Sequence, residues 1–329
     1  MTDRQFKKGE VIFLEGDMGN TMFQIQEGTV SIYVGYADED QLLLTKIGND
    51  RLFGEIAVIE ACPRSTTAVA NEEVRALEIS SDEVMDYFRT QPDRIMEILK
   101  NLSRRLRELT SDYADACNTV REIGDSLDKE FGGALLELII RFATEYRRNR
   151  SAMQLSIEAE RQISHGGSTG DYSPKLQTYS KGTIIFREGE MGDCMYYIRS
   201  GAVGIYEGYG TSDENLLTRL SADTFFGELG MIDNIERSCT AVVMERDTVI
   251  EVLITPDIIR MIETDPDRVK KILEHLSYRL RLLTVDYMNA CRMIYRVDQA
   301  RNSGRISEDL KSETKDFADS LVVIRSLKL

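Results

Sequence analysis

The sequence of 329 residues has 41 Lys and Arg against 56 Asp and Glu, a formal net charge of −15 at pH 7. So acidic a chain is repelled by phosphate backbones at long range, which argues against nonspecific nucleic-acid binding. Two histidines leave little for a zinc site or a His-dependent triad, and no apolar run reaches the roughly 20 residues of a membrane span. Five cysteines without metal-like spacing indicate free thiols. We expect about two domains, a cytoplasmic location, and no cofactor, metal, membrane or nucleic-acid partner.

The chain contains one long internal repeat. Residues 8–36 match residues 181–209 with 16 identities in 29 positions, at an offset of 173. Residues 53–69 match residues 226–242 at the same offset, and beyond them the offset becomes 174. A repeat of this length is too long for a solenoid and indicates a duplicated domain.

The early part of each copy has the pattern of short strands. Residues 29–34 and 202–206 are rich in β-branched side chains, and Gly16 and Gly189 mark turns between such segments. Many short strands with Gly turns predict a small antiparallel barrel or jelly roll in each copy. The fold class that we predict is α+β, with two barrel domains each followed by long helices.

A Phe-Gly-Glu…Arg-Ser block, which we call the cassette, follows the strands in each copy. In the first copy Gly54 lets the backbone approach a ligand closely, and the amides from Glu55 onward open a helical turn that can face an anion. Arg64 offers a planar fork for two phosphate oxygens, and an ionised Glu55 suits hydroxyl donors such as those of ribose. The matching residues of the second copy are Gly227, Glu228 and Arg237. Phosphate and sugar recognition together describe a nucleotide-sized ligand.

The later part of each copy has a helical period. Apolar residues recur at spacings of three and four over residues 99–123 and again over residues 273–297. This spacing predicts two helices with a narrow apolar seam. The seam can cover the helix's own barrel or pair with a second copy of the chain in a homodimer, and the sequence leaves both open.

The remaining segments are a connector and a tail. We predict a third helix near residues 128–150, a Gly/Ser linker at residues 165–171, and a loosely attached helix in the tail. The predicted domains are residues 1–127, the first barrel with its helix; 128–178, the connector; 179–300, the second barrel with its helix; and 301–329, the tail. No segment after Val297 is long enough for a winged helix-turn-helix, so we do not expect a transcription factor.

Both copies resemble the cyclic nucleotide-binding domain of protein kinase A regulatory subunits, catabolite activator proteins and cyclic-nucleotide-gated channels, over about residues 6–120 and 179–294. The resemblance implies that the cassette glutamate binds the ribose 2′-hydroxyl and the arginine binds the equatorial phosphate oxygen. Backbone amides after the glutamate and the residue after the arginine complete the implied phosphate cradle. The implied sites consist of Gly54, Glu55, Ile56, Ala57, Arg64 and Ser65, and of Gly227, Glu228, Leu229, Gly230, Arg237 and Ser238.

Base selectivity rests on the same resemblance. Ser65 and Ser238 resemble the pattern of bacterial cyclic AMP binders, whereas a threonine there often goes with cyclic GMP. The helix after the barrel usually caps the base, and Thr110 and Thr284 occupy matching places in it. Either threonine can bond an adenine N6 group or simply lie at the margin of the seam. We expect cyclic AMP as the ligand, with cyclic GMP as the alternative.

The two cassettes differ at Glu236, which stands where the first has Pro63 and puts an extra carboxylate beside Arg237. Both cassettes keep their arginine and glutamate. We therefore expect a non-catalytic sensor that transmits nucleotide binding through its helices to a partner protein. The alternatives are a constitutive scaffold with silent pockets and an enzyme acting on cyclic nucleotides, for which we find no metal cluster or nucleophile arrangement.

Overall fold

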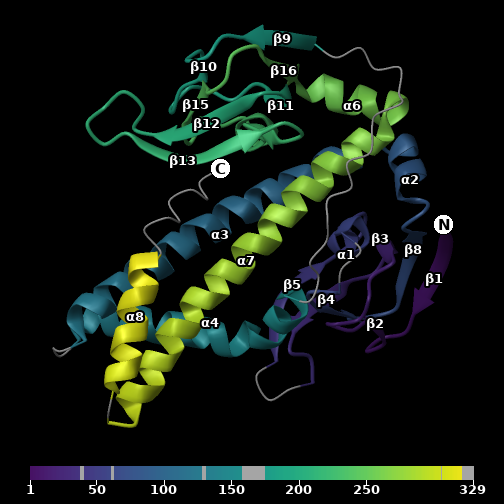
Figure 1. Ribbon diagram of the computed structural model, residues 1–329. Coiled ribbons are helices and arrows are strands. Elements are labelled where there is room, and N and C mark those ends of the chain that lie inside the picture. Colours follow the sequence, from purple (N-terminus) through teal and green to yellow (C-terminus); the bar gives the residue numbers. More distant parts are fainter. Residues whose placement is uncertain (38–40, 61–62, 128–130, 158–174, 305, 321–329) are drawn as a thin grey trace. The chain divides into compact units, whose positions relative to one another are not determined.

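The computed structural model describes residues 1–329 except 38–40, 61–62, 128–130, 158–174, 305 and 321–329 (Figure 1). The first repeat contains β1 (Thr2–Phe6), β2 (Val11–Phe13), β3 (Thr21–Glu27), β4 (Val30–Val34), β5 (Leu42–Ile47), β6 (Leu52–Phe53), α1 (Glu55–Glu60), β7 (Thr67–Ala70), β8 (Val74–Ser80), α2 (Val84–Thr90) and α3 (Asp93–Ser126). The second contains β9 (Lys175–Tyr179), β10 (Ile184–Phe186), β11 (Met195–Ser200), β12 (Ala202–Glu207), β13 (Asn215–Ser221), β14 (Phe225–Phe226), α5 (Glu228–Asp233), β15 (Thr240–Val243), β16 (Thr248–Leu253), α6 (Thr255–Thr264) and α7 (Pro266–Asn302). Two further helices are α4 (Gly133–Ile157) and α8 (Glu308–Ser320).

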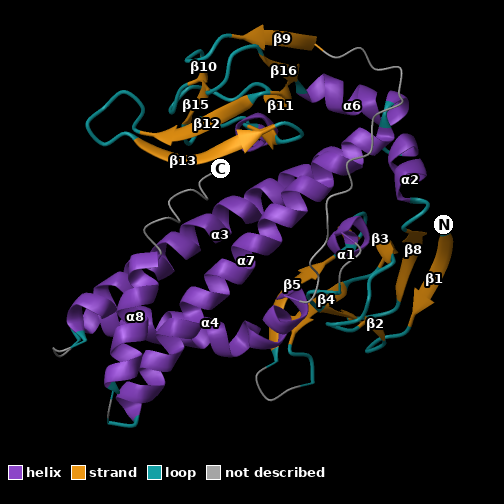
Figure 2. Cartoon of the chain, viewed as in Figure 1, coloured by secondary structure: helices purple, strands orange, loops and turns teal. Residues whose placement is uncertain are grey.

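Each repeat folds into a β domain of two four-stranded antiparallel sheets. In the first domain the strand orders are β1-β8-β3-β6 and β2-β7-β4-β5. The second domain has the same order strand for strand, β9-β16-β11-β14 and β10-β15-β12-β13. Figure 2 shows these strands and the helices that follow them. The predicted fold class, two antiparallel β domains each followed by long helices, is confirmed.

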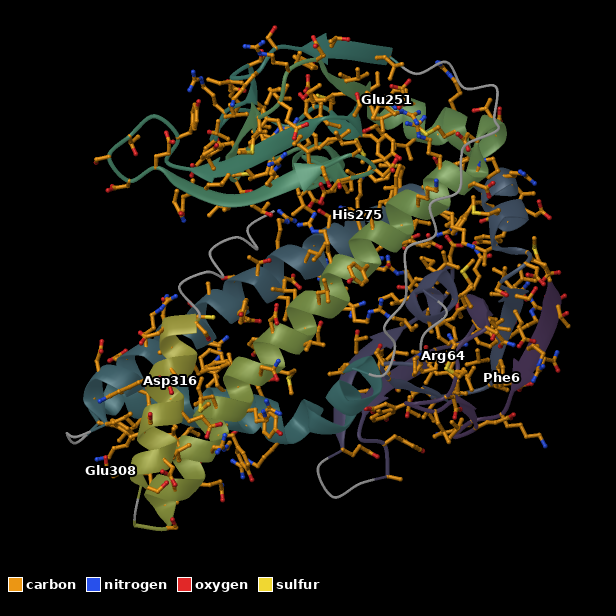
Figure 3. The ribbon with its side chains drawn as sticks, in the orientation of Figure 1. Phe6, Arg64, Glu251, His275, Glu308 and Asp316 are labelled. Carbon is orange, nitrogen blue, oxygen red and sulfur yellow. The ribbon has the colours of Figure 1, made fainter. Side chains whose placement is uncertain are left out.

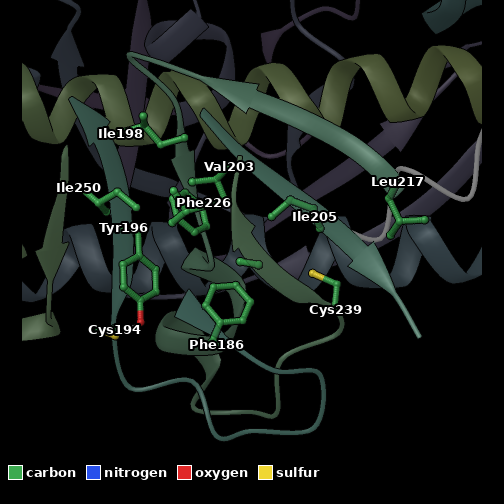
Figure 4. Packing of buried hydrophobic residues seen from close by; sticks show 12 residues of the cluster. Phe186, Cys194, Tyr196, Ile198, Val203, Ile205, Leu217, Phe226, Cys239 and Ile250 are labelled. Carbon is green, nitrogen blue, oxygen red and sulfur yellow. Dashed lines mark hydrogen bonds between the residues drawn. The ribbon is translucent and has the colours of Figure 1, made fainter. Parts of the chain in front are cut away.

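The inner face of each β domain is filled by alternate strand residues around three aromatic rings that pack closely together, two pairs stacked and one tilted. In the first domain the ring centroids of Phe13, Phe23 and Phe53 lie 5.2–6.2 Å apart. The matching rings of the second domain, Phe186, Tyr196 and Phe226, lie 5.0–6.0 Å apart (Figure 4). Rings in van der Waals contact bury a large apolar area, and stacked pairs add to that stabilisation.

The predicted seams form the buried stripes of α3 and α7. Most seam residues are at most 7% exposed, and Leu109 is partly buried. The third helix, α4, begins at Gly133 and extends to Ile157, beyond the predicted end at residue 150. The predicted linker at residues 165–171 lies outside the described residues. The tail contains α8, which buries Leu310, Thr314 and Ala318.

The chain divides into two compact units whose boundaries do not coincide with those of the two sequence repeats. The first unit is Met1–Tyr87, Asp112–Gln162 and Ser277–Ala318, and the second is Phe88–Ser111, Ile163–Leu276 and Asp319–Leu329. The amino-terminal part of α3 thus belongs with the second β domain, and the carboxy-terminal part of α7 belongs with the first. The domain boundaries expected from the sequence stay a prediction.

Within the first unit, α3, α4, α7 and α8 contact one another. Tyr287 of α7 packs edge-on against Phe142 of α4, with ring centroids 6.3 Å apart. Arg141 of α4 donates to Asp112 of α3 at 2.7 Å, and Arg296 of α7 pairs with Glu313 of α8. The seam residue Tyr287 is therefore covered by a helix of the same chain, and the homodimer alternative stays a prediction.

Within the second unit a buried carboxylate joins the β domain to α7. Glu251 of β16, marked in Figure 3, is fully buried. Its Oε2 accepts from Arg268 in the first turn of α7 and from Arg199 of β11, the latter at 3.0 Å. In the first domain the matching Glu78 pairs instead with the exposed Arg4 of β1 at 3.1 Å. The carboxylate of β16 thus joins its β domain to a helix, whereas the matching carboxylate of β8 pairs with a neighbouring strand.

Candidate functional site

The cassette begins with a glycine in a left-handed conformation. Gly54 has φ 76° and Gly227 has φ 71°, values that side chains with a Cβ rarely adopt. A Cβ added at Gly54 would lie 2.7 Å from Arg64 Nη1, and one at Gly227 would lie 2.8 Å from Arg237 Nη1. Glycine is therefore required at both positions, for the turn and for the approach of the arginine.

The first cassette arginine is buried and held by backbone carbonyls. Arg64, labelled in Figure 3, is 4% exposed. Its Nη1 donates to Gly54 O at 2.7 Å, and its Nη2 donates to the carbonyl and the hydroxyl of Thr21, at 2.5 and 3.2 Å. The guanidinium carbon lies 4.2 Å from the centroid of the Phe13 ring, which adds a cation–π contact.

The second arginine repeats this arrangement with one different partner. Arg237 is 5% exposed; its Nη1 donates to Gly227 O and its Nη2 donates to Cys194 O at 2.6 Å. Its guanidinium carbon lies 4.4 Å from the centroid of Phe186. Arg237 Nε is buried and has no hydrogen-bond partner among the described residues. A buried charged donor without an acceptor is costly, so this arrangement fits an anion bound beside the cassette.

The cassette glutamates open the short helices α1 and α5. Glu55 is partly buried, whereas Glu228 is 1% exposed. The first N–H groups of a helix have no acceptor within the helix, so the amides of these first turns are available to a ligand. The residues that share these turns are Ile56 and Ala57 in α1, and Leu229 and Gly230 in α5.

The serines after the arginines are exposed at the end of each cassette. Ser65 and Ser238 therefore lie beside their arginine in the chain and are open to solvent, as a ligand-contacting residue requires.

Two cysteines near the second cassette arginine are protonated. Cys239 follows Ser238, and burial raises the pKa of its thiol to about 11. Burial also raises the pKa of Cys194. Both cysteines are therefore neutral thiols at pH 7 and put no negative charge near the arginine.

Each predicted base-capping threonine bonds within its own helix and belongs to a different compact unit from its own cassette. Thr110 donates to Leu106 O at 2.7 Å and belongs to the second unit, whereas the first cassette belongs to the first. Thr284 donates to Leu280 O at 2.7 Å and belongs to the first unit, whereas the second cassette belongs to the second. Among the other predicted residues, each cassette arginine contacts its cassette glycine, and capping by these threonines stays a prediction.

Four residues that hold the arginines were missed by sequence reasoning. Phe13 and Phe186 stack on the guanidinium groups, and Thr21 and Cys194 accept from them. Identical phenylalanines at matching places of the repeat were a usable signal for the first pair. The second pair acts mainly through backbone carbonyls, which carry no sequence signal.

The described residues contain neither a metal-binding cluster nor a membrane-spanning helix. Its His, Cys, Asp and Glu side chains form no group of three or more able to hold a metal ion. None of its helices combines the length and the apolar character needed to cross a membrane.

The chain belongs to the cyclic nucleotide-binding domain family. The family model matches residues 3–91 and 176–265, more than half of the chain. Each match contains one β domain and one cassette, in agreement with the duplicated fold.

Some curated relatives match less than half of this chain, and others match about three quarters of it. The CRP-like cAMP-activated global transcriptional regulator of Mycobacterium tuberculosis is 31% identical over 43% of this chain and 60% of its own length. The cAMP-dependent protein kinase regulatory subunit of Debaryomyces hansenii is 26% identical over 75% of this chain and 42% of its own length. The chain thus spans about half the length of these relatives.

Among solved structures, the regulatory domain of Toxoplasma gondii PKA with cAMP is 15% identical and is covered over 83% of both chains, with a TM-score of 0.25.

Proposed function

We propose that this protein is a non-catalytic sensor that binds one cyclic nucleotide, cyclic AMP in preference to cyclic GMP, at each cassette. The observation that carries the proposal is the pair of buried arginines, each fixed by two backbone carbonyls and an aromatic ring. A cyclic nucleotide has one phosphate charge, which suits a single guanidinium, and a ribose hydroxyl, which suits a carboxylate. The choice of base is supported by cAMP in the names of the two relatives described above, although cGMP-dependent protein kinase 2 of Homo sapiens, 24% identical over 75% of this chain, is also similar.

Signal output would come from the helices attached to the β domains. A ligand that binds one arrangement of cassette and helix better than another shifts the population toward it, and a partner protein would read that change. Small-angle scattering with and without saturating cyclic AMP tests this step. Different profiles are expected, and superimposable ones would contradict the sensor mechanism.

Calorimetric titration with cyclic AMP and cyclic GMP tests the binding. Loss of a buried charged partner typically costs about 2–5 kcal/mol, so Arg64→Ala and Arg237→Ala should each weaken their own site by at least about thirtyfold. The matched controls are Arg4→Ala and Arg219→Ala, which remove exposed arginines from the same two β domains and should leave affinity unchanged. Absence of binding to ligand-free protein would favour a scaffold with silent pockets, and turnover of either nucleotide would contradict the non-catalytic assignment.

A further inference from the structure

The carboxy-terminal end of the second cassette helix contacts α3, the helix that follows the first β domain in the chain. Ser103 Oγ donates to Asp233 Oδ2 at 2.5 Å, and Arg107 Nη2 lies 3.0 Å from the same oxygen. Ser103 is fully buried, and the Asp233 side chain is 12% exposed. We call these three residues the α3–α5 contact; all of them belong to the second unit.

The geometry of α3 and the chemistry of the bonds make this contact specific. Residues four apart on a helix lie on the same face, so Ser103 and Arg107 reach one carboxylate together. Hydrogen bonds to an ionised acceptor are about twice as strong as neutral ones. The contact therefore fixes the position of Asp233 relative to α3.

Asp233 is the last residue of α5, and the cassette glutamate Glu228 is the first. At a rise of about 1.5 Å per residue, the two ends of this helix lie within about 9 Å. The helix end is a tight turn in which Asn234 has φ 53° and its N–H bonds Gly230 O. A displacement of Asp233 is therefore transmitted to the residues that open the cassette.

The repeat provides a matched position without this bond. Ser277 of α7 occupies the place of Ser103, at the offset of 174, and is 1% exposed. Its Oγ is buried and has no hydrogen-bond partner among the described residues. Ser277→Ala and Ser103→Ala remove the same atoms from equally buried positions. Only Ser103→Ala breaks a hydrogen bond that the structure describes.

We propose that Ser103 and Arg107 are positioning residues of the second nucleotide site. Through Asp233 they hold α5 in the arrangement that presents Glu228 and Arg237, so that affinity at the second site depends on a helix continuous with the first β domain. The inference rests on the proposed function. By linkage, a nucleotide at the second site strengthens the α3–α5 contact by the same factor.

Hydrogen exchange of the ligand-free protein tests the contact without any nucleotide. The amides of α5 should exchange faster in Ser103→Ala than in the parent protein, and Ser277→Ala should match the parent. Arg107→Gln, at a partly exposed position, is the milder variant and should increase the exchange less. Equal exchange in all four proteins would overturn the inference.

Titration with cyclic AMP tests the positioning role. In an Arg64→Ala background, where only the second site binds, Ser103→Ala should weaken affinity about tenfold and Ser277→Ala should not. In an Arg237→Ala background, where only the first site binds, Ser103→Ala should leave the affinity unchanged. A general loss of stability would weaken the first site as well.

Three results would overturn the positioning role. The first is equal second-site affinity in Ser103→Ala and Ser277→Ala, and the second is tighter binding by Ser103→Ala. The third is absence of nucleotide binding by the parent protein, which would overturn the proposed function as well. Hydrogen exchange would still report in that case whether the α3–α5 contact forms.

Discussion

The two cassettes share one frame and differ in what surrounds it. In both, a left-handed glycine, a buried arginine and an aromatic ring are arranged alike. Around this frame Glu55 is partly buried whereas Glu228 is fully buried, and Thr21 of the first site is replaced by Cys194 in the second. The short motif therefore determines how the arginine is held, whereas neighbouring strands and helices determine how each site is supported.

The largest expected difference concerns the matching carboxylates of β8 and β16, Glu78 and Glu251. Glu251→Gln removes the buried negative charge that accepts from Arg268, whose side chain is 5% exposed, and from Arg199, and breaking such a buried pair costs about 3–5 kcal/mol. Glu78→Gln removes a partner of the exposed Arg4 and should cost about 0–1 kcal/mol. Thermal unfolding followed by circular dichroism measures both. Equal losses would show that the two charge pairs do not distinguish the repeats.

A smaller difference is expected where one cassette has glycine and the other alanine. A Cβ at Gly230 would lie 3.0 Å from Arg237 Nη1 and 3.2 Å from Gly192 Cα, so its neighbours would have to move. Gly230→Ala should therefore weaken the second site by about 1 kcal/mol, or about fivefold. Ala57→Gly in the first cassette creates no such crowding and serves as the control. Calorimetric affinities that change equally in both variants would contradict this explanation.

The smallest expected difference concerns the side-chain partner of each arginine. Arg64 Nη2 lies 3.2 Å from the Thr21 hydroxyl, whereas Arg237 Nη2 lies 3.7 Å from Cys194 Sγ, a weaker acceptor. Cys194→Thr should strengthen cyclic AMP binding at the second site by about twofold, and Thr21→Cys should weaken the first site similarly. The two variants control for each other, because the proposed difference in acceptor strength predicts opposite changes in affinity. Affinity changes of the same sign at both sites would contradict it.

Much of the fold was predictable because the signals are local and occur twice. The strands follow from β-branched runs between Gly turns, and the seams of α3 and α7 follow from spacings of three and four. The cassette residues from Gly54 to Ser65 were predictable because the motif places them within one turn and one short helix. Resemblance to a known family then gave their roles.

The remainder depends on contacts that a linear pattern does not contain. An apolar stripe shows that a helix face is buried, but not against which element, so the sequence did not place residues 88–111 with the second β domain. The pairing of Glu251 with Arg268 joins a strand to a helix, and Ser103 meets Asp233 across 130 positions of the chain. The support that Cys194 gives Arg237 comes mainly from a carbonyl, which every residue has.

The most direct test of the account is the number of cyclic AMP molecules bound at saturation by ligand-free protein, measured by equilibrium dialysis. We expect two for the parent protein, one for Arg64→Ala, one for Arg237→Ala, and none for the double variant. A double variant that still bound cyclic AMP, or a parent protein that bound none, would contradict the assignment of these arginines as the centres of two nucleotide sites.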